Sequence, residues 1–426
     1  MSRPNDVVII GGGPAGITAA LLLKQTNHLT PVVYEATLQT ETYGGAIGIP
    51  PNGLRLLGQL GLFDEVATLG SSATNVVLHS VKGSVLGEAD ILSWTRNKTG
   101  YGLLKIMRSD LMEVLLKAAN KAGIYVQYGK QLAGIKETTD SVIAAFTDGT
   151  SVSGDILLGC DGVNSAVRNT YVDPGAVPRY TGISDYYSLV PMSDRPTIPG
   201  SLHALHATFT TSGMFALMHC RKSNDMNYWF FSYSVPGPET DEGSGGEWDE
   251  LKQSHIESFN PRLQGLLAEV GGEWGEMIRD FVAKSKDVGF HPIFNLPIGR
   301  PWYKGRCLLL GDAAHAMSPH LSQGVSQVLE DVFMLSRLLS ASSSPVAEKV
   351  FKAYDRNRRP RVEELSAKAK SQGSGRKQTA GWRLWLNELG ATVALGLYNI
   401  LGLDKLGLGQ GFMAYNVEEV ELLREE

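Results

Sequence analysis

Three glycines and one acidic residue near the N-terminus are spaced as in a phosphate-binding turn. Gly11, Gly13 and Gly16 form a G-x-G-x-x-G pattern after the apolar run Val7–Ile10, and Glu35 follows about 20 residues later. The first glycine permits a tight turn, the second lets backbone N–H groups approach a pyrophosphate, and the third lets a helix pack close to the strand. Glu35 can accept hydrogen bonds from ribose hydroxyls. This segment predicts a dinucleotide site, and it does not distinguish NAD from FAD.

A second group of residues that could bind a ligand begins at Gly311. Asp312 follows a short apolar run, so its carboxylate lies at the end of a strand, where it can hydrogen-bond a polyol such as the ribityl chain of FAD. A helix is expected to begin near Gly324, and its N-terminal dipole favours the negative charge that gathers on a flavin pyrimidine during reduction. Both features favour FAD. The structural alternative for Asp312 is a turn or helix cap.

The surrounding pattern predicts the elements that position these residues. Val7–Ile10 and Pro31–Glu35 are typical of buried strands on either side of a helix over Ala15–Gln25, which together form a βαβ opening. Two further helices are expected over Pro51–Leu60 and Arg108–Ala122, because apolar residues recur there at helical spacing and a glycine follows each segment.

The strongest hairpin signal is Asp148-Gly149, which lies between the strand-like runs Val142–Phe146 and Ser151–Ser153. Two more buried strands are expected at Ile156–Gly159 and Arg306–Leu310.

From Pro174 to Pro292 the pattern becomes rich in β-strands, with examples at Phe215–His219 and Tyr228–Val235. The acidic, glycine-rich tract Pro236–Gly246 predicts a mobile loop within this region. An inserted second domain is therefore expected.

Composition narrows the classes of function. The chain of 426 residues is long enough for two domains. Its net charge is -5 and it has no basic blocks, so it lacks the basic surface expected of a protein that binds nucleic acid. Cys160, Cys220 and Cys307 are too few and too far apart for a disulfide framework or a cysteine-rich metal site. No cluster of metal ligands surrounds His315, which is expected to be a packing residue. No secretory signal follows Met1, so a cytoplasmic location is expected.

The longest apolar stretch, Leu389 to Leu403, is short for the roughly 20 residues of a membrane span. It is expected to form a docked C-terminal helix. The alternative is an interfacial helix, with Trp382, Arg383 and Trp385 as anchors, that brings the protein to a membrane and an apolar substrate.

Three further motifs are spread along the chain. They are Arg108-Ser-Asp-Leu111, Gly159-Cys-Asp161-Gly162-Val-Asn-Ser165-Ala-Val-Arg168, and Gly311-Asp-Ala-Ala-His315 with Ser318-Pro319 and Ser322-Gln-Gly324 after it. In this order they resemble the class A flavoprotein monooxygenases, a family that includes p-hydroxybenzoate and salicylate hydroxylase. The resemblance runs from the first strand to Arg361.

The resemblance implies FAD as cofactor and NAD(P)H as a co-substrate that visits and leaves. Gly45-Ala46-Ile-Gly48 would pass along the flavin, Arg108 would help to hold FAD, and Asp161 would touch both FAD and NAD(P)H. A surface charge at the start of its helix is the structural alternative for Arg108. The expected cofactor-binding residues are Gly11, Gly13, Ala15, Gly16, Glu35, Gly45, Ala46, Gly48, Arg108, Asp161, Asp312, Gly324 and Val325.

Pattern and resemblance together imply an α/β fold with three parts. A Rossmann-like FAD-binding domain of the glutathione-reductase type is expected over residues 1–173 and 293–370, with an inserted β-sheet substrate domain over 174–292. Residues 371–426 are expected to form a C-terminal helical segment.

The resemblance also implies the reaction. NAD(P)H would reduce FAD, O₂ would add at the flavin C4a position, and the hydroperoxide would deliver one oxygen atom to an electron-rich carbon. The substrate would be an aromatic or unsaturated small molecule that is hydroxylated or epoxidised, in secondary metabolism or in the breakdown of foreign compounds. Monomer and homodimer are both left open.

On the substrate side the sequence departs from the family. Tyr187 stands where many relatives carry an arginine, which argues against a clamp of that kind for an anionic or phenolic substrate, and Ser322 replaces the first glycine of a Gly-Gln-Gly loop. The candidates on the substrate side, for each of which packing is the alternative, are Tyr187, His219, Arg221, Tyr228 and Trp229. The expected catalytic side chains among them are Arg221, Tyr228 and Tyr187.

Two other functions remain open. A flavin-dependent reductase or dehydrogenase of the geranylgeranyl-reductase type would pass hydride to an alkene and consume no O₂. A non-catalytic binding protein on the same fold, such as the prenyl-GTPase escorts, would not retain flavin, and the intact pyrophosphate and ribityl motifs argue against it. A halogenase is disfavoured because the Trp-x-Trp-x-Ile-Pro motif is absent.

Overall fold

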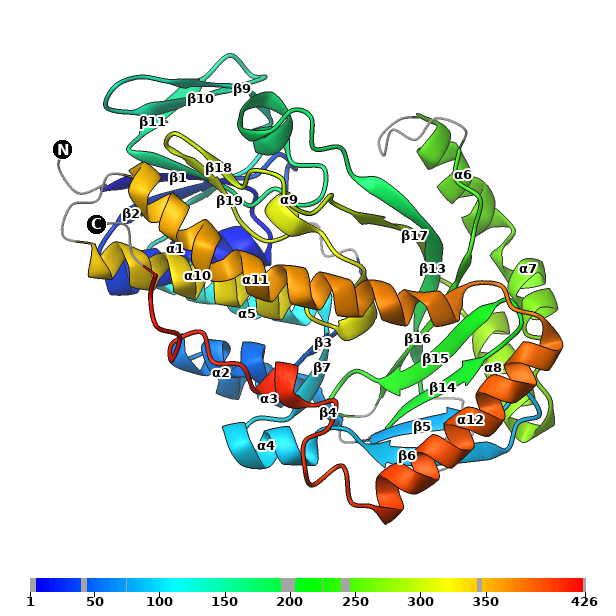
Figure 1. Ribbon diagram of the computed structural model, residues 1–426. Helices are drawn as coiled ribbons and strands as arrows, with labels where there is room; N and C mark the ends of the chain where they lie inside the picture. Colours follow the sequence, from blue (N-terminus) through cyan, green and yellow to red (C-terminus); the bar gives the residue numbers. More distant parts are fainter. Residues whose placement is uncertain are drawn as a thin grey trace.

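The computed structural model describes residues 5–39, 44–73, 75–192, 204–223, 225–238, 246–342 and 347–423. The chain forms two lobes, one built on a mainly parallel sheet and one on a larger, mostly antiparallel sheet. A long helix, α11 (Ala347–Gly373), runs between them (Figure 1). Residues 239–245, most of the tract expected to be a mobile loop, lie outside the described residues.

The first lobe is built on a six-stranded sheet with the order β18-β19-β12-β1-β2-β8, in which only the β18 pairing is antiparallel. The strands are β1 (Asp6–Ile10), β2 (Thr30–Tyr34), β8 (Val126–Gln127), β12 (Ile156–Gly159), β18 (Tyr303–Lys304) and β19 (Cys307–Leu309). Every residue of β12 and β19 is buried, as expected for parallel strands that are covered on both faces.

Helices cover one face of this sheet, and a small antiparallel sheet lies against the other (Figure 1). The helices are α1 (Pro14–Asn27), α5 (Arg108–Lys121) and α10 (Gly324–Ala341), and the small sheet consists of β9 (Leu132–Glu137), β10 (Val142–Phe146) and β11 (Ser151–Gly154). The hairpin expected at Asp148-Gly149 is confirmed, because β10 pairs with β11 and Gly149 has a φ of +83°. The βαβ opening and the mixed α/β fold class are confirmed as well.

A third sheet joins the lobes. It has the order β3-β7-β4, and its strands are β3 (Ala46–Ile49), β4 (Ser71–Ala73) and β7 (Leu103–Met107). The helices beside it are α2 (Pro51–Gln59), α3 (Phe63–Leu69) and α4 (Ser93–Thr99). The helices expected over Pro51–Leu60 and Arg108–Ala122 correspond to α2 and α5 and are confirmed.

The second lobe is a seven-stranded sheet with the order β17-β13-β16-β15-β14-β5-β6. Its strands are β5 (Asn75–His79), β6 (Val85–Asp90), β13 (Arg179–Pro191), β14 (Leu205–Phe209), β15 (Gly213–His219), β16 (Met226–Ser234) and β17 (Val288–Asn295). Two of them, β5 and β6, come from residues 75–90, within the range expected for the cofactor-binding domain.

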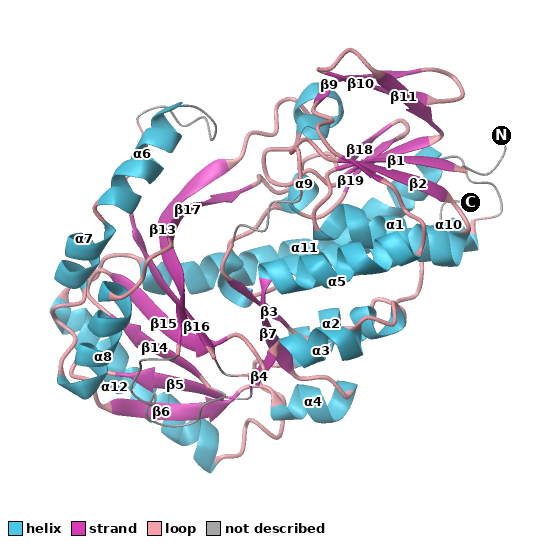
Figure 2. Cartoon of the chain, turned by 180° about the vertical axis from the view of Figure 1, so that it is seen from behind, coloured by secondary structure: helices cyan, strands magenta, loops and turns pink. Residues whose placement is uncertain are grey.

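Three helices cover the side of the large sheet that faces away from the first lobe, as Figure 2 shows. They are α6 (Gly246–Glu257), α7 (Phe259–Leu266) and α8 (Gly272–Ala283). Tyr186, Phe215, Trp229 and Phe231 of the sheet form a buried aromatic core beneath them together with Phe281 of α8. The opposite face of the sheet is therefore left for the first lobe.

Helix α12 (Gly381–Ile400) packs along the edge strand β6, with Leu395 against Gly87. Its outer face is apolar: of seventeen large apolar side chains that are exposed in the described chain, ten lie between Trp382 and Leu408. No helix among the described residues is long and apolar enough to span a membrane. The C-terminal helix is thus docked along one face and leaves an apolar row on the other.

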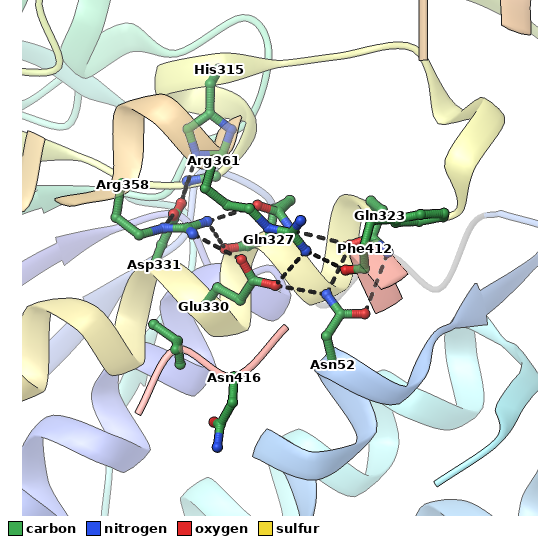
Figure 3. A network of polar contacts seen from close by, with 12 residues as sticks. Asn52, His315, Gln323, Gln327, Glu330, Asp331, Arg358, Arg361, Phe412 and Asn416 are labelled. Carbon is green, nitrogen blue, oxygen red and sulfur yellow. Dashed lines mark hydrogen bonds and ion pairs between the residues drawn. The ribbon is translucent and has the colours of Figure 1, made fainter. Parts of the chain in front are cut away.

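A buried polar network ties α10 to α11 (Figure 3). Arg358 of α11 is fully buried; its Nε donates to Asp331 Oδ1 and its Nη1 donates to Glu330 Oε2, both at 2.8 Å. Burial opposes ionisation of Asp331, but His315 and Arg358 together hold the pKa of its carboxyl below the usual range. Asn52 of α2 joins the network by donating to Glu330 Oε1 at 2.7 Å.

We predict that Arg358→Met lowers the free energy of unfolding by roughly 3–5 kcal/mol, because two buried carboxylates lose their cation. Denaturant titration of the FAD-loaded protein measures the change. Lys368→Met is the matched control on the same helix: it removes an exposed ion pair with Glu364 and should cost less than about 1 kcal/mol. Equal losses for the two variants would contradict the role assigned to burial.

Candidate active site

The turn between β1 and α1 has the shape that a pyrophosphate requires. Gly11 has a φ of +107°, and a Cβ on it would lie 2.4 Å from the Cys160 carbonyl oxygen. A Cβ on Gly16 would lie 1.9 Å from the Gly11 carbonyl oxygen, so glycine is required at both positions. The space around Gly13 is open among the described residues, since a Cβ there would meet none of their atoms within 4 Å apart from its chain neighbours. The N-terminus of α1 therefore faces a free cradle that fits a phosphate group.

Glu35 is held at the edge of this cradle. Its Oε2 accepts the Gly12 N–H at 2.6 Å, and its Oε1 accepts the Thr37 N–H at 3.0 Å. These bonds fix the carboxylate beside the glycine turn, where it can also accept ribose hydroxyls.

The other half of the expected cofactor site begins at Gly311, whose φ is +60°. Its N–H donates to Asp331 Oδ2 at 2.9 Å, and the same oxygen lies 2.7 Å from His315 Nε2. The network of Figure 3 thus fixes the turn that presents Asp312, the first residue of α9 (Asp312–His315). His315 is buried, so the structure uses it as a packing and hydrogen-bonding residue.

Asp312 begins α9 and is exposed, although desolvation by the surrounding protein raises the pKa of its carboxyl. An exposed carboxylate at the end of this turn is available to the hydroxyls of a polyol chain. Among the described residues no group of histidine, cysteine and carboxylate side chains is arranged to hold a metal ion.

Four segments that are far apart in sequence meet at β3. A Cβ on Gly45 would lie 2.1 Å from Tyr228 Cε2, and one on Gly48 would lie 3.2 Å from Ser322 Cβ. The Arg108 N–H donates to the Gly45 carbonyl oxygen at 3.1 Å. The segment expected to run along the flavin therefore contacts the large sheet on one side and the loop before α10 on the other.

The motif around Asp161 forms a closed loop beside the glycine turn. Asp161 Oδ1 accepts the Ser165 hydroxyl at 2.6 Å and Oδ2 accepts the Val167 N–H at 3.1 Å, while burial raises the pKa of the carboxyl. Arg168 is buried and its Nη1 donates to the Ala313 carbonyl oxygen at 2.9 Å. This arginine links the Asp161 loop to the residue after Asp312.

The face of the large sheet toward the first lobe carries half-buried aromatic side chains. Side chains alternate along a strand, so Tyr187 and Leu189 of β13 point to this face together with Tyr228 and Phe230 of β16. Tyr187 lies across Gly289 of β17, where a Cβ would be 2.2 Å from its Cζ. The centroids of the Tyr187 and Tyr228 rings are 6.2 Å apart. Together these residues form an aromatic wall next to Gly45.

The structure brings Tyr187 and Tyr228 to the cofactor segments but places the other candidates elsewhere. The Nε and Nη2 atoms of Arg221 each lie 3.3 Å from a carboxylate oxygen of Asp110 on α5. Trp229 is fully buried on the opposite face, where its Nε1 donates to Ser285 Oγ at 2.8 Å. His219 is buried as well.

Four polar residues at the aromatic wall were missed by sequence reasoning. Asp185 lies two residues before Tyr187 on the same strand, and side chains alternate along a strand. This spacing could have predicted that both point to the same face. His291 stands directly opposite Asp185 on β17. His320, in the short helix Pro319–Leu321, and Arg376, after α11, follow no motif that marks them.

Ser322 has the backbone conformation of a glycine. Its φ is +54°, and His28 is the other non-glycine residue of the described chain with a positive φ. The left-handed conformation costs a residue with a Cβ roughly 1 kcal/mol, which explains the glycine of the family pattern.

We predict that Ser322→Gly raises the free energy of unfolding of the FAD-loaded protein by about 1 kcal/mol, since glycine adopts this conformation without strain. Ser322→Ala keeps the Cβ and should give no such gain. An equal gain for alanine and glycine in thermal denaturation would show that backbone strain is not the cause.

Comparison with known proteins agrees with this geometry. The family model described as "FAD binding domain" matches residues 5–262 and 297–369. The chain is 29% identical to 3-amino-4-hydroxybenzoate 2-monooxygenase of Streptomyces cremeus, over 87% of each chain. It is 27% identical to 6-hydroxynicotinate 3-monooxygenase of Pseudomonas fluorescens, over 86% of this chain and 90% of the relative. It is 28% identical to an FAD-dependent urate hydroxylase of Klebsiella pneumoniae, over 89% of this chain and 94% of the relative.

Solved structures share the fold. The crystal structure of Klebsiella pneumoniae HpxO in complex with FAD and uric acid superposes with a TM-score of 0.77, at 24% identity, over 95% of this chain and 97% of that one. The 2,6-dihydroxypyridine-3-hydroxylase of Arthrobacter nicotinovorans gives a TM-score of 0.71, at 17% identity, over 88% and 93%. From the glycine cradle, the Asp312 turn and these matches, the chain belongs to the FAD binding domain family, in which its relatives are FAD-dependent aromatic monooxygenases.

Proposed function

We propose that the chain is a monooxygenase that uses NAD(P)H and O₂ to insert one oxygen atom into an aromatic or unsaturated small molecule. The observation that carries the proposal is the contact between Tyr228, on the aromatic wall, and Gly45, in the segment expected to run along the flavin. This contact supports the proposal because a surface suited to a flat ring would then lie next to the expected position of the reactive part of the cofactor. The relatives' names refer to hydroxybenzoate, hydroxynicotinate and urate, which supports a planar substrate with oxygen substituents.

The residues present fit FAD. The open cradle at Gly13 would take the pyrophosphate, Glu35 the ribose, and Asp312 the ribityl chain, while Arg108 stands at the segment beside the flavin. The N-terminus of α10, at Gly324, would favour negative charge on the pyrimidine. Bound flavin would take two electrons from NAD(P)H and, once reduced, react with O₂, so that one oxygen atom enters the substrate and the other leaves as water.

The chain's own side chains would bind and orient the substrate. Burial raises the pKa of Tyr187 and of Tyr228, so both hydroxyls stay protonated near neutral pH. A protonated hydroxyl can donate to an oxygen substituent and fix which ring carbon faces the flavin. Phe230 and Leu189 supply apolar surface that excludes water from the reacting carbon. Arg221 would act on a substrate only after its ion pair with Asp110 opened.

The FAD-loaded protein is expected to oxidise NADPH or NADH faster when a substrate is present, with matched uptake of O₂ and a product heavier by one oxygen atom. A panel of phenols, hydroxypyridines, indoles and polyenes, followed with an oxygen electrode and mass spectrometry, tests this. Reduction of an alkene without O₂ uptake would support the reductase instead. A colourless protein that retains no FAD would contradict the proposal.

Asp312→Asn is predicted to weaken FAD binding by about tenfold or more, because a charge-assisted hydrogen bond to the ribityl chain is lost. The change keeps the side-chain shape, so thermal stability of the FAD-free protein should be unchanged. Asp64→Asn, at an exposed position on α3, is the control. Equal FAD content of the two variants after dialysis would exclude Asp312 as a cofactor ligand.

A further inference from the structure

Beyond the residues expected to hold FAD, polar side chains from three distant parts of the chain gather at the aromatic wall. Asp185 is on β13, Ser232 is on β16, and Arg376 follows the end of α11. His320 joins them from the turn just before Ser322. The cluster therefore lies where the large sheet, helix α11 and the loop before α10 come together.

Asp185 is the acidic member of the cluster. It stands two residues before Tyr187, so its side chain points to the same face of the sheet. Ser232, its cross-strand neighbour, donates its hydroxyl to Asp185 Oδ1, and the described residues provide no second hydrogen bond to this carboxylate. Burial raises the pKa of Asp185 to about 6, against the opposing effects of Ser232 and Arg376. Asp185 and Tyr228 point to the same face of the sheet, and the Tyr228 ring covers Gly45, so the cluster shares this face with the segment expected to run along the flavin.

Arg376 is the basic member and is held rigidly. It exposes only 9% of its surface, and its Nη1 donates to the Gln372 carbonyl oxygen at 3.0 Å. The backbone around it is fixed to the sheet, since the Thr379 N–H donates to the Thr211 carbonyl oxygen at 2.8 Å. Its Nε is buried without a hydrogen-bond partner among the described residues. A buried donor of a charged group is costly to leave unpaired, and this points to an acceptor that is supplied from outside the chain.

Arg376 ends the turn Ser374–Arg376, which packs against β15 and against β16, the strand that carries Ser232. Its charge opposes the rise in the pKa of Asp185, and no direct ion pair joins the two side chains among the described residues. Each of them can form one further hydrogen bond: Asp185 through a carboxylate oxygen that can accept, and Arg376 through a guanidinium N–H that can donate. Burial and the charge of Arg376 lower the pKa of His320 to about 3, so this imidazole stays neutral and adds no third charge. The cluster thus contains one acceptor and one donor that no described side chain uses.

We propose that Asp185 and Arg376 form a substrate-recognition pair for a neutral unit in which an N–H or O–H donor lies beside a carbonyl acceptor, as in an amide, a lactam or a hydroxy-carbonyl ring. The donor of the ligand would be accepted by Asp185, and its carbonyl oxygen would be bound by Arg376. A lone carboxylate would be repelled by Asp185, and a lone ammonium would be repelled by Arg376. This inference rests on the proposed function, because it assigns the substrate of the same site.

The test is equilibrium dialysis of FAD-loaded protein without NAD(P)H against three probes of similar size: 2-quinolinone, which carries the lactam, 2-naphthoate, which is an anion, and quinoline, which lacks the donor–acceptor unit. The wild-type protein is expected to bind 2-quinolinone most tightly. Arg376→Met and Asp185→Asn should each weaken 2-quinolinone binding by about tenfold, and quinoline binding should change less than about twofold, because only the former uses both groups.

The anionic probe separates recognition from a general loss of structure. Asp185→Asn removes the repulsion and should strengthen 2-naphthoate binding, whereas Arg376→Met should weaken it. Arg383→Met, at an exposed position on α12, is the control and should change none of the three affinities. If Arg376→Met fails to fold, Arg376→Lys and Ser232→Ala replace it, and each should weaken 2-quinolinone binding.

The assignment would be overturned if the folded variants bound 2-quinolinone with unchanged affinity. It would also be overturned if Asp185→Asn and Arg376→Met did not change 2-naphthoate affinity in opposite directions. The binding measurement uses no NAD(P)H and requires no turnover. Its result therefore does not depend on whether the protein reacts with O₂. A protein that binds 2-quinolinone through this pair but couples no O₂ would keep the recognition site and refute the monooxygenase.

Discussion

The Asp331 carboxylate on α10 has three partners at once, and the Asp312 half of the expected cofactor site depends on this arrangement. It accepts the Gly311 N–H, lies within hydrogen-bond distance of His315, and is neutralised by Arg358 of α11. A charge at this depth is tolerated only when it is paired and hydrogen-bonded. The end of β19, helix α10 and helix α11 are therefore fixed relative to one another, and the turn that carries Asp312, the residue after Gly311, is held with them.

Helix α11 carries this constraint into the second lobe. It contacts α10 through Arg358 and extends to the second lobe, where it ends at Gly373 (Figure 1). The turn Ser374–Arg376 that follows packs against β15 and β16 of the large sheet. The element that neutralises Asp331 thus also sets the position of Arg376 relative to Asp185. The same helix thus supports both the turn expected to hold the cofactor and the cluster proposed to recognise the substrate.

Sequence reasoning succeeded where a few consecutive residues decide the structure. The turn at Gly11 and the hairpin at Gly149 need backbone conformations that glycine allows, so they could be predicted locally. The strand β5 was not foreseen in the large sheet, because its pairing with β14 joins segments that are distant in sequence. The same limit applies to charged residues: Arg221 is neutralised by Asp110, whereas Arg376 Nε has no hydrogen-bond partner among the described residues, and residue type alone does not distinguish the two.

The central claim, that one atom of O₂ enters the substrate, is tested most directly by turnover under ¹⁸O₂. The FAD-loaded protein is supplied with NAD(P)H and its substrate, and the product is weighed by mass spectrometry. We predict that the added oxygen atom carries the ¹⁸O label, and that product formed under ordinary O₂ in H₂¹⁸O carries none. An unlabelled product, or one that has gained hydrogen instead of oxygen, would contradict the account.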